Sequence, residues 1–167
     1  MGQNKTNGTL KNSKINVKSP EVQKILAKVL ESSYRPRQLK SALEKIDAKN
    51  HQKELMDFVE RYGKWYGTDH QIHGMRDIEV EMILEIALNK VKDQDFLIKF
   101  VKSYRDGEFM HNVRISALRK IKDQLLLSRF AVETTFRNEA LFALSKIRDP
   151  ELLYDVVSKS INPIVCI

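Results

Sequence analysis

Apolar residues recur at helical spacing along most of the 167-residue chain. The first run follows Ser19-Pro20-Glu21 and consists of Val22, Ile25, Leu26, Val29 and Leu30. Serine caps helices, proline favours their first position and an acidic residue favours their first turn, so the pattern predicts a helix over residues 20–33. Helical spacing continues to the end of the chain, interrupted by three glycines from residue 63 to residue 76. We therefore expect an all-α protein.

One eight-residue pattern is written almost identically twice. ALNKVKDQ begins at Ala87, and ALRKIKDQ begins at Ala117, thirty positions later. A third copy begins at Ala143, and a looser copy, one residue shorter before its aspartate, begins at Ala42. The small alanine beside the large leucine lets a helix approach its neighbours closely. The recurrence predicts stacked helix pairs that share a continuous core.

The aspartate of each copy is predicted to begin the next helix, because its carboxylate can accept hydrogen bonds from the free N–H groups of the first turn. The basic residues just before it then fall in the last turn of the preceding helix, where cations favour the negative end of the dipole. We therefore assign capping roles to Asp93, Asp123 and Asp149.

The repeated Ala-Leu-x-x-Ile-x-Asp pattern, together with Val113-Arg114-Ile115-Ser116-Ala117-Leu118, resembles the wording of HEAT repeats. The resemblance covers roughly residues 35–167 and implies a short right-handed α-solenoid of stacked antiparallel helix pairs, HEAT- or armadillo-like, with about nine helices. The chain departs from the family where Ile83-Leu84 replaces Val-Arg and where Arg137 lies six residues before Ala143 instead of three. The repeat pairs are expected roughly at 35–62, 77–104, 112–133 and 135–160.

Charge and composition divide the chain into two parts. Residues 1–18 contain four lysines and no acidic residue, so they carry four of the seven net positive charges and leave +3 for residues 19–167. The first part is rich in Asn, Lys, Gly and Thr and has no sustained hydrophobic period. We expect residues 1–18 to be a disordered basic arm and residues 19–167 to form the HEAT-like repeat domain.

The single cysteine, Cys166, excludes an internal disulfide and is typical of a reducing compartment. No apolar run approaches the ~18 residues that span a bilayer, and the N-terminus lacks the apolar core of a signal peptide. A cytoplasmic protein is therefore expected. Met1-Gly2-Gln3-Asn4-Lys5-Thr6 also fits the pattern for N-myristoylation, and a lipid on Gly2 together with the arm lysines would attach the chain to a membrane.

Two groups of residues are candidates for partner binding. Trp65 and Tyr66 are an aromatic contact patch or, alternatively, a cover for the joint between helix pairs. Lys99, Lys102 and Arg129 would line one face of the second helices and form a groove for an acidic partner or an ordinary solvated face. His70 and His73 are candidate metal ligands, but the chain lacks a Cys pair and a His-Glu-x-x-His helix, so we expect no metal and no cofactor.

The sequence favours a non-catalytic scaffold or adaptor that binds a protein partner. HEAT-like deoxyhypusine hydroxylases ligate iron through His-Glu dyads, which this chain lacks, and HEAT-like alkylpurine DNA glycosylases use a strongly basic groove that residues 19–167 do not supply. A phosphate-cradling Gly-rich loop and a nucleophile motif are also missing. The alternative is a nucleic-acid-binding protein that uses the basic arm and a mildly basic helical face.

The last eight residues, SINPIVCI, are largely apolar, although a solenoid normally ends in a polar face. Three explanations stay open: these residues fold back as a cap, a partner covers the end, or a further repeat would follow in a longer array.

Overall fold

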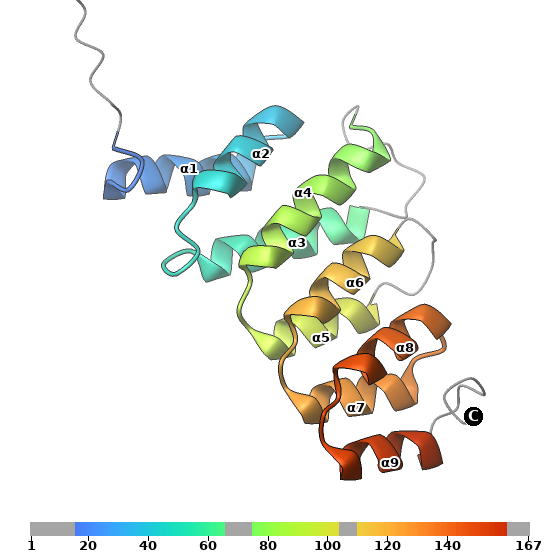
Figure 1. Ribbon diagram of the computed structural model, residues 1–167. Coiled ribbons are helices and arrows are strands. Elements are labelled where there is room, and N and C mark those ends of the chain that lie inside the picture. Colours follow the sequence, from blue (N-terminus) through green and yellow to red (C-terminus); the bar gives the residue numbers. More distant parts are fainter. Residues whose placement is uncertain (1–15, 66–74, 104–109, 160–167) are drawn as a thin grey trace, which may run out of the picture.

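The computed structural model describes residues 16–65, 75–103 and 110–159, which form nine helices and no strand (Figure 1). The all-α prediction is therefore confirmed for this part of the chain. The helices are α1 (Pro20–Ser32), α2 (Pro36–Lys45), α3 (Gln52–Trp65), α4 (Asp77–Lys90), α5 (Gln94–Ser103), α6 (Met110–Lys120), α7 (Gln124–Glu133), α8 (Arg137–Lys146) and α9 (Pro150–Lys159).

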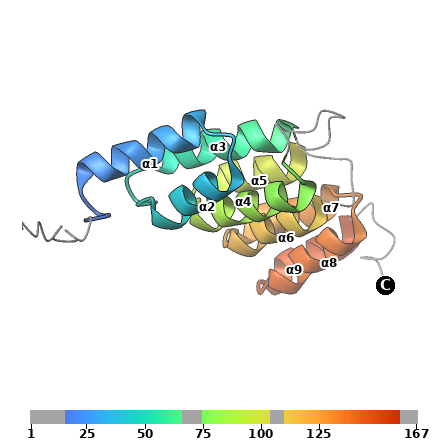
Figure 2. The ribbon, with the colours of Figure 1, turned by 90° about the horizontal axis from the view of Figure 1, so that it is seen from above.

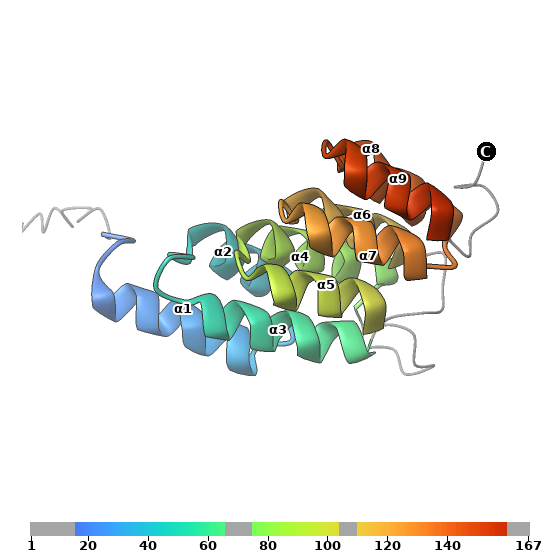
Figure 3. The same ribbon diagram turned by 90° about the horizontal axis from the view of Figure 1, so that it is seen from below.

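The helices lie in two rows. Helices α2, α4, α6 and α8 form one row, here called the A row, in which each helix packs against the next (Figure 1). Helices α1, α3, α5, α7 and α9 form the B row, which lies beside the A row when the molecule is viewed from above and from below (Figures 2 and 3). In the described part of the chain, no helix is long and apolar enough to cross a membrane.

Packing across the two rows is closest between each B-row helix and the A-row helix that follows it in sequence. The packed pairs are α1 with α2, α3 with α4, α5 with α6, and α7 with α8. The pairs defined by the sequence repeat instead join helices on either side of a short connection, such as α4 and α5. Each sequence unit except the last described one, α8 and α9, therefore contributes its two helices to two neighbouring packed pairs.

The first helix begins where the sequence predicts. The hydroxyl of Ser19 accepts a hydrogen bond from the backbone N–H of Val22 at 3.4 Å, and Pro20 occupies the first helical position. Residues 16–18 form a turn before this cap, and the side chain of Gln23 donates to the carbonyl of Val17 at 2.7 Å. The remainder of the predicted arm, residues 1–15, lies outside the described residues.

The Ala-Leu pairs of the repeated pattern form the centre of the core. Ala87, Leu88, Ala117 and Leu118 are completely buried, as are the connection residues that follow these pairs, Val91 and Ile121. The small side chains lie in the A row, where α4, α6 and α8 pack side by side. Leu118, in the second copy of the pattern, is therefore a core residue.

One charged cluster lies inside this core, between α6 and α8. The Nη2 atom of Arg114 is 2.8 Å from Oε1 of Glu139, and both residues are only 2% exposed. Nδ1 of the half-buried His111 lies 3.1 Å from the same carboxylate oxygen. The Arg114 guanidinium also lies over the ring of Phe136, 4.3 Å from its centroid. The arginine of the Val-Arg pair in the repeat, Arg114, therefore forms an ion pair that joins two A-row helices.

Candidate binding surface at the connection edge

The connections that lead from an A-row helix to the following B-row helix lie along one edge of the molecule (Figure 1). We call this the connection edge. Three of the connections have three residues each, and the first is longer. The four connections are residues 46–51, 91–93, 121–123 and 147–149.

A glutamine from a B-row helix bridges each connection. Its side-chain nitrogen donates to the carbonyl of the last residue of the next A-row helix, at 3.0–3.5 Å. Its side-chain oxygen accepts from the backbone N–H two residues further on, at 2.6–2.8 Å. Each bridge satisfies a carbonyl that the helix end leaves without a partner. The four bridging residues are Gln23, Gln52, Gln94 and Gln124.

Two of these glutamines are the last residues of ALNKVKDQ and ALRKIKDQ, but the local pattern does not indicate their bridging role. A glutamine directly after a capping aspartate, repeated at a fixed interval, is the signal that could have pointed to the bridge. The bridge partners of these two glutamines lie 22 to 28 residues away in sequence, so the pattern alone does not identify them.

The three aspartates of the repeated words accept hydrogen bonds from the first turns of the helices that follow. Asp93 accepts from the N–H of Phe96 at 2.8 Å. Asp123 accepts from two N–H groups of α7 at 2.9 and 3.0 Å, and Asp149 accepts from two of α9 at 2.9 and 3.4 Å. These three carboxylates are therefore hydrogen-bonded to the backbone of the following helices at the connection edge.

Two lysines reach across the A row to the end of the preceding helix. The ammonium of Lys90 donates to the carbonyls of Glu44 and Ile46 at 2.9 and 3.2 Å. Lys146 donates to three carbonyls at the end of α6, at 2.6–2.7 Å. Loss of hydration on burial lowers the pKa of Lys90 and of Lys146. The sequence placed these cations at the end of their own helix, whereas their ammonium groups bind the neighbouring helix.

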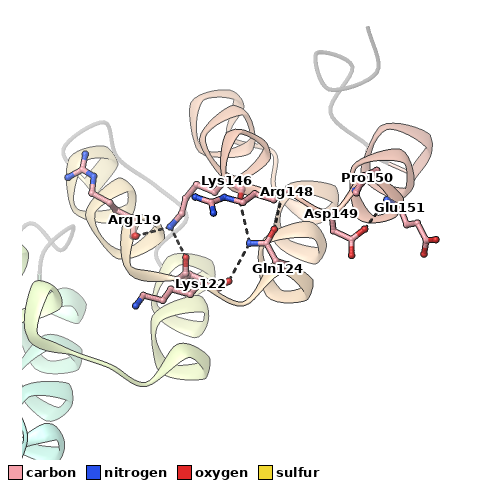
Figure 4. Close-up of a pocket in the computed structure, with 9 residues that line it drawn as sticks. Arg119, Lys122, Gln124, Lys146, Arg148, Asp149, Pro150 and Glu151 are labelled. Carbon is pink, nitrogen blue, oxygen red and sulfur yellow. Dashed lines mark hydrogen bonds between the residues drawn. The ribbon is translucent and has the colours of Figure 1, made fainter.

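An open groove with a volume of about 1190 Å³ lies between the third and fourth connections (Figure 4). Four cationic and two acidic side chains line it, together with an isoleucine, a glutamine and a proline. The four cations outnumber the two acids, so the groove carries a net positive charge, although Asp149 caps α9 and Lys146 is held by carbonyls. The lining residues are Arg119, Ile121, Lys122, Gln124, Lys146, Arg148, Asp149, Pro150 and Glu151.

The structure places the predicted basic residues Lys99, Lys102 and Arg129 on the B row, on α5 and α7, and all three are exposed. Two of them are paired with acids of neighbouring helices. Lys99 is 3.3 Å from the carboxylate of Glu60 on α3, and Lys102 is 2.6 Å from that of Glu133 on α7. These ion pairs link α3, α5 and α7, and they reduce the positive charge that this face offers to a partner.

The predicted aromatic and histidine candidates fall at the edge of the described chain. Trp65 is the last residue of α3, whereas Tyr66, His70 and His73 lie outside the described residues, as do Gly2 and residues 160–167. Within the described ranges, no group of three histidine, cysteine or acidic side chains is arranged to hold a metal ion.

The described residues thus define an all-helical protein in which one bonding pattern, a glutamine bridge across a connection, recurs four times. Comparison of the chain with protein-family models, with curated protein sequences and with solved structures gives no match.

Proposed function

We propose that the chain is a short right-handed α-solenoid of the HEAT-like kind and that it acts as a non-catalytic scaffold for a protein partner. The four glutamine bridges carry the architectural part of this proposal. Each bridge joins a B-row helix to the connection after the next A-row helix, so every unit is fastened to its neighbour in the same way. Nearest-neighbour fastening of this kind is what defines a solenoid.

The same bridges support a role in binding. They fix the backbone of successive connections before any partner arrives, so a partner would lose little affinity to ordering of this surface. The groove between the third and fourth connections supplies a concave and basic place on that edge. A rigid surface with a groove is typical of scaffold proteins that present one side of a helical array.

A protein partner is favoured over nucleic acid because of how the basic side chains are used. On the B row, Lys99 and Lys102 face carboxylates of neighbouring helices. On the connection edge, Lys90 and Lys146 bind backbone carbonyls. A mixed surface with a limited positive excess fits a selective contact with a protein better than a continuous phosphate backbone, whose binding grows with the number of free cations.

Affinity capture from the source lysate tests the function. The full chain and a chain that begins at residue 16 would each be used as bait, with and without nuclease, and captured proteins would be identified by mass spectrometry. The scaffold proposal expects the same protein to be captured by both baits despite nuclease. Capture that disappears with nuclease, or with residues 1–15, would instead make the basic arm and nucleic acid responsible.

A further inference from the structure

A row of exposed cations follows the connection edge. In each of the three short connections, the residue directly before the capping aspartate is basic: Lys92, Lys122 and Arg148. All three side chains are exposed, and none forms an ion pair with another residue of the described chain. We call these three residues the cation row.

The glutamine bridges set the spacing of the cation row. The backbone N–H of Lys92 donates to Gln52 at 2.8 Å, and those of Lys122 and Arg148 donate to Gln94 and Gln124 at 2.7 Å. The three side chains therefore leave the backbone at equivalent points of successive units. Packed helices lie 8–10 Å apart, so consecutive members of the row are separated by roughly 10 Å at the backbone.

The groove described above lies between the second and third members of the row, with Lys122 on the α6 side and Arg148 on the α8 side (Figure 4). The exposed side chain of Pro150 adds apolar surface to it, over the buried Ile121. The groove thus combines a place for a chain segment with charges at its two sides.

We propose that the cation row binds an extended acidic peptide segment in which every third residue is Asp or Glu. In the extended polyproline II conformation a chain has three residues per turn and rises about 3.1 Å per residue, so every third side chain lies on the same side, roughly 9 Å from the next, close to the spacing of the row. The carboxylates of Asp149 and Glu151 in the same groove disfavour a ligand that is charged at every unit. A peptide with neutral residues between its acids matches both the cations and these carboxylates. This proposal rests on the proposed scaffold function and names its partner's chemistry.

Two fluorescein-labelled peptides of identical composition test the spacing with the full chain. One carries acids at every third position, and the other carries the same acids in one block, with binding followed by fluorescence anisotropy at low ionic strength. We expect the periodic peptide to bind the wild-type chain about tenfold more tightly than the block peptide, because only it meets all three cations at once. Equal affinity for the two peptides overturns the proposed register.

Two matched triple variants test the residues. Lys92→Gln/Lys122→Gln/Arg148→Gln removes the cation row, and Lys28→Gln/Lys64→Gln/Arg137→Gln removes two lysines and one arginine that are exposed elsewhere. The first variant should lose about tenfold in affinity for the periodic peptide, and the second should stay within about twofold of the wild type. Circular dichroism melts that coincide for both variants ensure that folding is not the cause. Equal losses in the two variants overturn the proposal.

A labelled single-stranded oligonucleotide serves as a further probe. Tight binding of this probe that the cation-row variant loses, with no binding of either peptide, would assign the row to nucleic acid and overturn the peptide proposal. Affinity capture from lysate distinguishes failure of the peptide proposal from failure of the scaffold function. If the cation-row variant still captures the wild-type partner, the scaffold stands and only the site assignment fails, whereas absence of any captured protein with the wild-type chain removes the scaffold itself.

Discussion

We expect loss of the ion pair between Arg114 and Glu139 to lower the free energy of unfolding more than any other change of comparable size to one side chain. The substitution Glu139→Gln keeps the shape of the side chain and removes its charge. The two charged groups are 2.8 Å apart and 2% exposed. With an effective dielectric constant of about 20, their Coulomb attraction is about 6 kcal/mol.

Most of that attraction offsets the cost of burying the two charges, so it is not the net stability of the pair. Removing one charge of a buried pair deprives the other of its counter-ion, which typically costs about 3–5 kcal/mol. We expect Glu139→Gln to lower the free energy of unfolding by that amount in urea denaturation followed by circular dichroism. The exposed pair Lys102–Glu133 supplies a control, since Glu133→Gln should cost about 0–1 kcal/mol.

The double variant Arg114→Met/Glu139→Leu separates a buried charge from simple loss of packing. It removes both charges, and His111 keeps contact with water because it is only partly buried. We therefore expect the double variant to be more stable than Glu139→Gln alone. A Glu139→Gln chain within about 1 kcal/mol of the wild type, or a double variant less stable than the single one, would show that the pair is not buried as described.

Three further predictions concern the core, a bridge and a tyrosine. Leu118→Ala should destabilise the protein by about 2–5 kcal/mol through a cavity, and an unchanged thermal melt would contradict its burial. Gln94→Leu should accelerate hydrogen exchange of the Lys122 amide but not of the Arg148 amide, which Gln124 holds, and unchanged exchange at Lys122 would refute the bridge. Burial raises the pKa of Tyr62 from 10.0 to about 12, so the folded protein retains this proton longer than the unfolded chain. Its stabilising contribution is therefore complete below pH 10 and lost as the pH rises through about 12, and Tyr62→Phe should abolish this loss and the late step of an ultraviolet absorbance titration.

Local signals in the sequence predict the helices because they act within one turn. Ser19 and Pro20 fix the start of α1 through contacts that reach three residues at most. The repeated Ala-Leu pairs predict burial because a small and a large apolar residue recur at the positions where two A-row helices pack against each other. Ala117 and Leu118 are completely buried for this reason.

The candidate surface could not be predicted in the same way, because its important contacts are long-range. Nothing in the sequence next to Lys90 indicates that its ammonium group bonds to the end of α2, 44 to 46 residues earlier. The ion pairs of Lys99 and Lys102 depend on where α3 and α7 lie relative to α5, so the sequence pattern indicated a basic face that the structure partly neutralises. Gln94 and Gln124 are visible in the repeat, but their partners become clear only once the rows are assembled.

The two basic surfaces therefore differ in what a ligand must displace. An acidic group that approaches Lys99 or Lys102 competes with a carboxylate already within 3.3 Å, so part of its attraction is spent in breaking an ion pair that links two helices. At the connection edge, the nearby aspartates are held by helix N–H groups, and the cations of the row have no carboxylate partner among the described residues. An acidic ligand gains its attraction there without loosening the fold. For this reason selection among acidic partners is expected at the connection edge, and the B-row pairs are expected to contribute to the alignment of α3, α5 and α7.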